Sequence, residues 1–220
     1  MKRTLLKICC IKNIEEAELA IKYGASALGL VSEMPSGPGV ISEDKIAEIS
    51  DFIPPGISSF LLTSKQDVEQ IIEQQKRCGT NVIQLVDSLP VGSHQTLKSA
   101  LPGVKIVQVV HVQGESSMDE AVSISDKVDA LLLDSGNQTS KVKELGGTGR
   151  IHDWKISRAI VEQSACPVFL AGGLNPGNIK QALEEVEPFG IDVCSGIRTK
   201  GNLDENKLKL FSEIIFNKIH

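Results

Sequence analysis

The sequence predicts an α/β protein whose 220 residues form a single-domain (β/α)8 TIM barrel with parallel strands. Short runs rich in β-branched and aliphatic residues alternate with longer amphipathic segments, the pattern of βα units around a parallel sheet. Eight such pairs use the whole chain, near the lower size limit of a closed barrel. An open doubly wound sheet is the alternative. It is less favoured because no early strand carries the GxGxxG turn of dinucleotide-binding sheets.

Each predicted strand is a short apolar run that ends before a turn. All of these runs are far shorter than the roughly 20 apolar residues that a membrane helix requires, so no membrane segment is expected. In chain order, we expect strands at Leu5–Cys9, Ala27–Val31, Ile57–Leu62, Val82–Leu85, Ile106–Val110, Ala130–Leu133, Val168–Ala171 and Ile191–Val193.

The helices between the strands are recognised by their capping residues. Asn13 is expected to cap a helix through Tyr23, whose apolar positions keep helical spacing and which Gly24 terminates. Ser42 should open a second helix over Lys45–Ser50.

Two later helices follow the same logic. Ser64 is expected to begin a helix that closes before Gly79, and Asp204 is expected to cap the last helix.

Composition limits the possible partners. The hydrophobic fraction of 41% and the charged fraction of 23% are ordinary for a globular protein. The net charge is −5 and the 23 basic residues are scattered, so no nucleic-acid footprint is predicted. The cysteines are odd in number, lack CxxC metal-ligand spacing and follow no secretory leader, which favours a reducing cytoplasm. They are Cys9, Cys10, Cys78, Cys166 and Cys194.

In a closed barrel, the chemistry lies at the carboxyl ends of the strands. Such residues can also have a purely structural role: a cysteine is often a small buried hydrophobic residue, and an aspartate before Ser-Gly-Asn often forms a turn. Bare glycine N–H groups at a helix start are suited to a phosphate dianion. The residues in such places are Cys9, Cys10, Asp87, His111, Asp134, Gly172, Gly173, Ser195 and Gly196.

The ordered set of motifs along nearly the full chain resembles the phosphoribosylanthranilate isomerase family of tryptophan biosynthesis. The likeness begins with Lys7-Ile8-Cys9 and with Gly24-Ala25-Ser26-Ala27-Leu28-Gly29. It continues through Leu132-Leu133-Asp134-Ser135, Gly146-Gly147-Thr148-Gly149, Leu170-Ala171-Gly172-Gly173-Leu174 and Asp192-Val193-Cys194-Ser195-Gly196.

The resemblance implies an Amadori rearrangement of an N-linked 5-phosphoribosyl amine, without a cofactor or metal. Such a reaction needs a general acid for the ring oxygen and a general base for the C2 proton. By position, Asp134 would be the acid and Cys9 the base. The sugar phosphate would rest on Gly172, Gly173, Ser195 and Gly196, while Gly147, Gly149, Asp87 and Arg198 would form the substrate wall.

Two departures from the family pattern concern the substrate end. Cys10 stands where the family has glycine, and the loop Pro35-Ser36-Gly37-Pro38-Gly39 lacks the arginine expected to bind the anthranilate carboxylate. Arg198 is a candidate replacement; the alternative is that it pairs with a surface carboxylate. The sequence therefore predicts a phosphoribosylanthranilate isomerase, monomeric or homodimeric. The alternatives are an isomerase of another phosphosugar amine and a non-catalytic phosphosugar-binding barrel.

Overall fold

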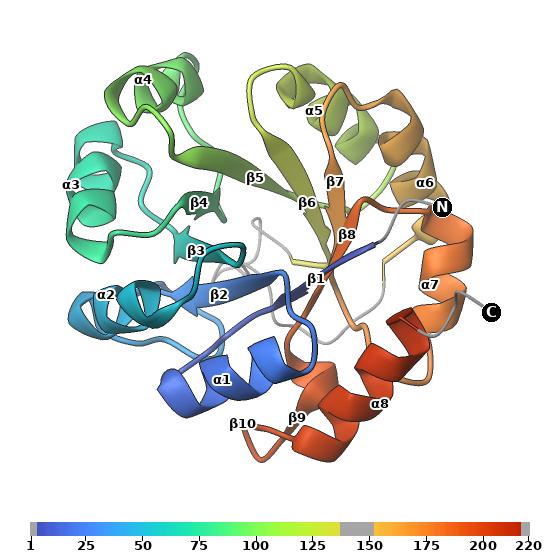
Figure 1. The fold of residues 1–220 in the computed structure, drawn as a ribbon. Coiled ribbons are helices and arrows are strands. Elements are labelled where there is room, and N and C mark those ends of the chain that lie inside the picture. Colours follow the sequence, from blue (N-terminus) through green and yellow to red (C-terminus); the bar gives the residue numbers. More distant parts are fainter. Residues whose placement is uncertain (1–3, 137–151, 217–220) are drawn as a thin grey trace.

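The computed structural model describes residues 4–136 and 152–216, and these form a closed eight-stranded parallel barrel. Each strand pairs with the next one in the chain, and β8 pairs with β1 to close the ring (Figure 1). The predicted fold class is confirmed. The strands are β1 Leu5–Ile8, β2 Ala27–Val31, β3 Ser58–Thr63, β4 Val82–Leu85, β5 Lys105–His111, β6 Ala130–Asp134, β7 Val168–Leu170 and β8 Gly190–Val193.

Helices follow the strands and surround the barrel (Figure 1). Asn13 caps the first of them and Ser42 the second, as predicted, each side chain accepting from a backbone N–H three residues on. The helices are α1 Ile14–Lys22, α2 Glu43–Phe52, α3 Val68–Cys78, α4 Ser93–Ala100, α5 Ser116–Ser125, α6 Trp154–Gln163, α7 Ile179–Val186 and α8 Glu205–Phe216.

Alternation along the strands separates two packed layers. In β1, Leu6 and Ile8 belong to the large apolar cluster that also contains helix residues. Cys9, Phe60 and Phe169 belong to a second cluster that contains no helix residue and fills the barrel interior. Because successive strand residues face opposite sides, Lys7 in β1 and Cys9 directly after β1 point to the interior.

Two local predictions need correction. Helix α3 begins three residues later than expected, because Asp67 rather than Ser64 accepts the backbone N–H of Gln70, at 2.9 Å. A small antiparallel pair, β9 (Arg198–Thr199) with β10 (Asn202–Leu203), was not predicted. Both residues of its turn, Lys200 and Gly201, have positive φ, as two-residue hairpin turns require.

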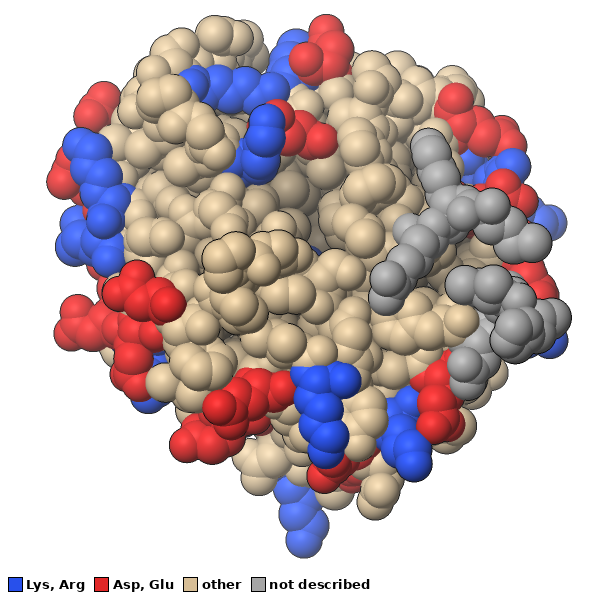
Figure 2. Space-filling model, viewed as in Figure 1, with Lys and Arg blue, Asp and Glu red and all other residues tan. Residues whose placement is uncertain are grey.

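Charged side chains show no single-sign patch on the face drawn in Figure 2. Lys and Arg lie interspersed with Asp and Glu, mostly around the periphery of that face. Among the described helices, none is long and apolar enough to cross a membrane.

Candidate active site

A cavity lies at the carboxyl ends of the strands, where the sequence predicts the chemistry. It brings together Cys9, Asp134, Gly172, Gly173 and Ser195 from four of the eight βα units. The units that contain these residues are neighbours around the barrel, in the order β6, β7, β8 and β1. The remaining described lining residues are Cys10, Val31, Met34, Ser36, Gly37, Pro38, Leu62, Gln84, Val86, Ala171, Leu174, Asp192 and Cys194.

Cys9 directly follows β1 and is 6% exposed. Its backbone N–H donates to the carbonyl of Val193 at 2.9 Å, which fixes it against the end of β8. The next residue, Cys10, has φ +64°, a left-handed conformation that favours glycine. The chain thus keeps the tight turn with a side chain present. Gly39 makes room for that side chain, since a Cβ added at Gly39 would lie 2.5 Å from Cys10 Cβ.

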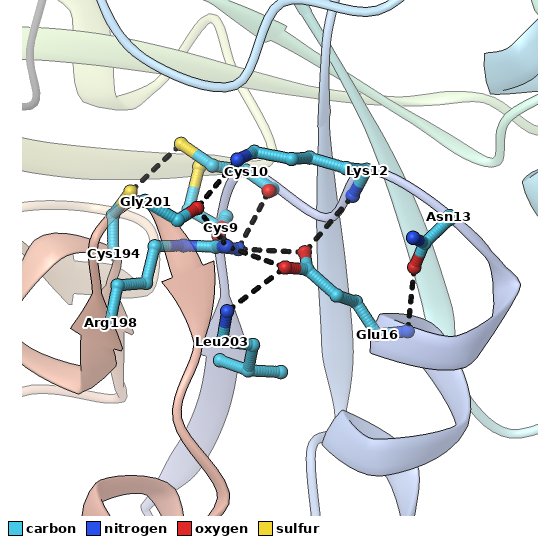
Figure 3. Close-up of polar contacts among 9 residues, drawn as sticks. All are labelled: Cys9, Cys10, Lys12, Asn13, Glu16, Cys194, Arg198, Gly201 and Leu203. Atoms are coloured by element: carbon cyan, nitrogen blue, oxygen red, sulfur yellow. Dashed lines mark hydrogen bonds and ion pairs between the residues drawn. The ribbon is translucent and has the colours of Figure 1, made fainter.

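Arg198 lies behind this turn rather than in the cavity wall. Its guanidinium forms a buried ion pair with Glu16, with Nη1 to Oε1 at 2.8 Å and Nη2 to Oε2 at 3.1 Å (Figure 3). Nη2 also donates to the carbonyl oxygens of Cys9, at 3.1 Å, and of Cys10, at 2.6 Å. Both expectations for Arg198 therefore need correction: it supports the turn at Cys9 and neither lines the cavity nor pairs with a surface carboxylate.

Asp134 is the last residue of β6, and its carboxylate is positioned by the residue that follows it. Its Oδ1 accepts the backbone N–H of Ser135 at 2.7 Å. A Cβ added at Gly172 would meet both Asp134 Oδ1, at 3.2 Å, and His152 Nδ1, at 3.1 Å, so the three residues adjoin. Burial lowers the pKa of His152 against the opposing attraction of Asp134 and Asp153. His152 was not among the site residues predicted from the sequence, because nothing in its local pattern distinguished it.

The two glycine turns after β7 and β8 meet at the cavity. Gly172 and Gly173 have φ +83° and +65°, and the carbonyl of Gly173 accepts from the side chains of Asn175 and Asn178, each at 3.0 Å. Gly196 does not line the cavity among the described residues. A Cβ at Gly196 would overlap the carbonyl oxygen of Leu174, so this glycine permits the close contact of the two turns.

An ion pair beneath the cavity was missed by sequence reasoning. Lys7 Nζ lies 2.8 Å from Asp192 Oδ2, with side-chain exposures of 0% and 8%, and Asp192 reaches the cavity wall. Burial alone would lower the pKa of Lys7, but attraction to Asp192 and to Cys9 raises it. The available signal was the alternation of side chains along a strand. Lys7 lies two positions before Cys9, and Asp192 lies two positions before Cys194, so each points to the same side as that cysteine.

The other predicted residues fall outside the cavity lining or outside the described residues. His111 is buried and its Nε2 lies 3.1 Å from the carbonyl of Val86. Asp87 is 4% exposed and accepts the backbone N–H of Ser88. Gly147 and Gly149 lie outside the described residues. Among the described lining residues none is Lys or Arg, so no cation takes the place of the absent arginine there.

Comparison with known proteins gives a consistent result. A family model described as N-(5'phosphoribosyl)anthranilate (PRA) isomerase matches residues 6–214. The N-(5'-phosphoribosyl)anthranilate isomerase of Methanosarcina acetivorans is 31% identical over 96% of this chain and 92% of its own length. Isomerase 2 of Methanosarcina mazei is 35% identical over 92% and 90%.

Solved structures agree in fold as well as in sequence. The crystal structure of phosphoribosyl anthranilate isomerase from Thermotoga maritima has a TM-score of 0.83 and 27% identity, covering 97% of this chain and 99% of that one. A second isomerase structure, in complex with reduced 1-(o-carboxyphenylamino)-1-deoxyribulose 5-phosphate, has a TM-score of 0.81 and 25% identity over the same shares.

Proposed function

Because this chain belongs to the N-(5'-phosphoribosyl)anthranilate isomerase family, we propose that Cys9 and Asp134 are its base and acid. The enzyme catalyses the Amadori rearrangement of N-(5'-phosphoribosyl)anthranilate to the 1-deoxyribulose 5-phosphate product, an isomerisation in tryptophan biosynthesis. The observation that carries the assignment is the shared cavity, in which the thiol of Cys9 and the carboxyl of Asp134 lie at strand ends beside two glycine turns.

The two groups divide the proton transfers. Asp134, protonated at the start, gives its proton to the ring oxygen, so that the ribose ring opens and the C1–nitrogen bond becomes an iminium. Cys9, as thiolate, then removes the C2 proton, and the resulting enaminol tautomerises to the amino ketose. Positioned acid–base groups of this kind contribute roughly 100-fold to 10,000-fold in rate.

The phosphate anchors the substrate at the opposite end from the aglycone. Backbone N–H groups at Gly172, Gly173 and Ser195 offer donors to a dianion, and α7 begins shortly after the first of these turns. Close approach requires backbone without a side chain, which Gly172 and Gly173 supply, and their positive φ angles are ones that glycine adopts readily.

The aglycone would lie against the loop after β2. Met34, Ser36, Gly37 and Pro38 line that side of the cavity. This loop has no Lys or Arg for a carboxylate, so its own contacts with anthranilate would be apolar or from neutral donors. An isomerase for a different phosphosugar amine, whose aglycone has no carboxylate, is the second candidate, and the absence of Lys and Arg among the described lining residues is the observation that favours it.

We further propose that the enzyme works in the cytoplasm as a monomer or homodimer. Five free cysteines support a reducing compartment.

The decisive experiment follows the loss of phosphoribosylanthranilate fluorescence on addition of purified protein. Cys9→Ser and Asp134→Asn should each lower kcat by at least 100-fold with little change in binding of ribose 5-phosphate. The matched controls are Cys166→Ser and Asp126→Asn. Asp126 is exposed at the end of α5, and Cys166 lies outside the described cavity lining.

The outcomes separate the candidates. Turnover that depends on both residues supports the acid–base assignment on anthranilate. Turnover that survives Asp134→Asn would remove the assigned acid. Absence of turnover together with ribose 5-phosphate binding would favour another aglycone or a binding role.

A further inference from the structure

Cys10 and Cys194 place two thiols in contact across the rim of the cavity. Their Sγ atoms lie 2.8 Å apart, although the residues are 184 positions apart in the chain (Figure 3). Both side chains line the cavity beside Cys9. In the described part of the chain, no group of three or more His, Cys, Asp or Glu side chains is arranged to hold a metal ion, so this cluster has no metal-binding explanation.

The backbone directs these two thiols toward each other. The left-handed φ of Cys10 turns its side chain away from the strand direction of β1 and onto Gly39. Cys194 follows β8, immediately before the short 3-10 helix Ser195–Ile197. The pairing of β1 with β8 aligns Ile8 with Val193, so Cys9 and Cys194 follow at the same level and Cys10 is the next residue after Cys9.

The two thiols differ in their readiness to ionise. A hydrogen bond with Cys10 lowers the pKa of Cys194 against the opposing effect of burial, and the positive charge of Arg198 lowers it further. Hydrogen bonds with Cys194 and Cys9, together with burial, raise the pKa of Cys10 well above its ordinary value. Since the thiolate is the nucleophile in thiol chemistry, Cys194 is the attacking group and Cys10 keeps the proton.

We propose that Cys10 and Cys194 form a reversible disulfide that switches the active site off under oxidising conditions. With hydrogen peroxide as oxidant, the Cys194 thiolate attacks one peroxide oxygen; an S–O bond forms and the O–O bond breaks, giving a sulfenic acid and, after protonation, water. The Cys10 thiol then attacks that sulfur, an S–S bond forms, and a second water leaves. The two sulfurs together lose two electrons, which the peroxide accepts.

The disulfide would displace the site residues next to it in the chain, Cys9 and Ser195. Cys10 follows the base Cys9, and Cys194 precedes Ser195 in the phosphate-binding turn. A disulfide needs about 2.05 Å between its sulfurs, so the two thiols must approach from their present separation of 2.8 Å. The turns that hold Cys9 and Ser195 then shift together, and a displacement on the order of 1 Å at a reacting group costs roughly 100-fold in rate.

Vicinal pairing of Cys9 with Cys10 is the competing product. It would close a strained ring between adjacent residues, whereas Cys194 approaches from a separate strand. Mass spectrometry distinguishes the two, because trypsin leaves Cys9 and Cys10 together in peptide 8–12 and Cys194 in peptide 181–198.

The experiment treats the reduced enzyme with hydrogen peroxide, maps the peptides and follows activity before and after dithiothreitol. We expect a cross-link between peptides 8–12 and 181–198, a mass loss of two hydrogens, and a roughly 100-fold fall in turnover that dithiothreitol reverses. Cys10→Gly and Cys194→Ser, each compared with its own reduced form, should show neither cross-link nor reversible loss. Cys166→Ser should behave as the unmodified chain.

The effect on turnover rests on the proposed function, but the cross-link does not. An enzyme that turns over no phosphoribosylanthranilate and still forms the Cys10–Cys194 cross-link would count against the proposed function alone. Absence of the cross-link, a vicinal Cys9–Cys10 product, or equal loss of activity in both variants would overturn the switch.

Discussion

Most residues of the candidate site were predictable from the sequence, because strand ends in a barrel have a fixed location. Cys9, Asp134, Gly172, Gly173 and Ser195 all lie on the cavity wall. Arg198 was misplaced because a sequence does not reveal which carboxylate an arginine meets, and here Glu16, 182 positions earlier, is that partner.

A substitution at Gly172 tests whether the turn after β7 binds the substrate phosphate. Gly172→Ala places a methyl group at a φ of +83°, 3.1 to 3.2 Å from His152 Nδ1, Asp134 Oδ1 and Ser135 Oγ. The left-handed backbone alone should cost about 1 to 2 kcal/mol in the free energy of unfolding. Because the turn must tilt, KM for the phosphorylated substrate should rise about tenfold, a loss of roughly 1.4 kcal/mol in binding.

Steady-state kinetics checks this expectation, with Gly114→Ala as the control. Gly114 has no positive φ, and a Cβ there would meet no atom within 4 Å. A Gly172→Ala enzyme with unchanged KM would show that phosphate binds elsewhere.

All ends of the eight barrel strands were predicted to within one residue, because apolar runs are local signals in the sequence. The β9 and β10 pair was missed because it consists of two-residue strands joined by Lys200 and Gly201, too short to show alternation. This pair holds Arg198 in place and connects it to α1 through Glu16. A single carboxylate thereby joins elements from the two ends of the described chain.

Glu16→Gln should remove the ion pair with Arg198 and change the pH dependence of the free energy of unfolding. Burial would raise the pKa of Glu16, but hydrogen bonds from Arg198 and from the backbone N–H groups of Leu203 and Lys12 lower it overall. The ionised Glu16 therefore stabilises the fold at pH values above its unfolded-state pKa, which is close to 4.5. This contribution is lost as the pH falls through the lower folded-state pKa. At pH 7 the substitution leaves Arg198 buried without its partner, which should cost about 3 kcal/mol.

Urea unfolding at pH 7 and at pH 3 measures this difference. The gap in the free energy of unfolding between the unmodified chain and Glu16→Gln should narrow at the lower pH. Glu15→Gln, on the exposed face of α1, should leave stability nearly unchanged at both. A gap that widens on acidification would contradict the assigned sign.

The whole barrel was predicted from the count of eight βα units, since eight strands with right-handed crossovers close on themselves. The ion pair in the barrel interior was not predicted, because a lysine in a strand is usually interpreted as a surface residue. Lys7 and Asp192 lie on β1 and β8, the two strands that close the ring. Their ion pair lies across that closure and reaches the floor of the site.

Lys7→Met should destabilise the closed barrel by about 3 to 5 kcal/mol, because it leaves the Asp192 carboxylate buried without a partner. The double variant Lys7→Met/Asp192→Asn removes both charges and should cost less than Lys7→Met alone, a strongly non-additive result. Urea unfolding of the two variants provides the measurement. Lys76→Met, which removes an exposed pair with Glu73, should change stability by less than about 1 kcal/mol. Additive costs would indicate that the pair does not act as a unit.

The pairing of β1 with β8 also has a consequence during protein synthesis. Ser195 lies 186 positions after Cys9, so it leaves the ribosome much later. Until then β1 has no β8 partner, and its edge carries unpaired backbone groups that invite wrong pairing. Until β8 has emerged, the nascent chain therefore lacks part of the proposed phosphate site, and ligand binding cannot stabilise it.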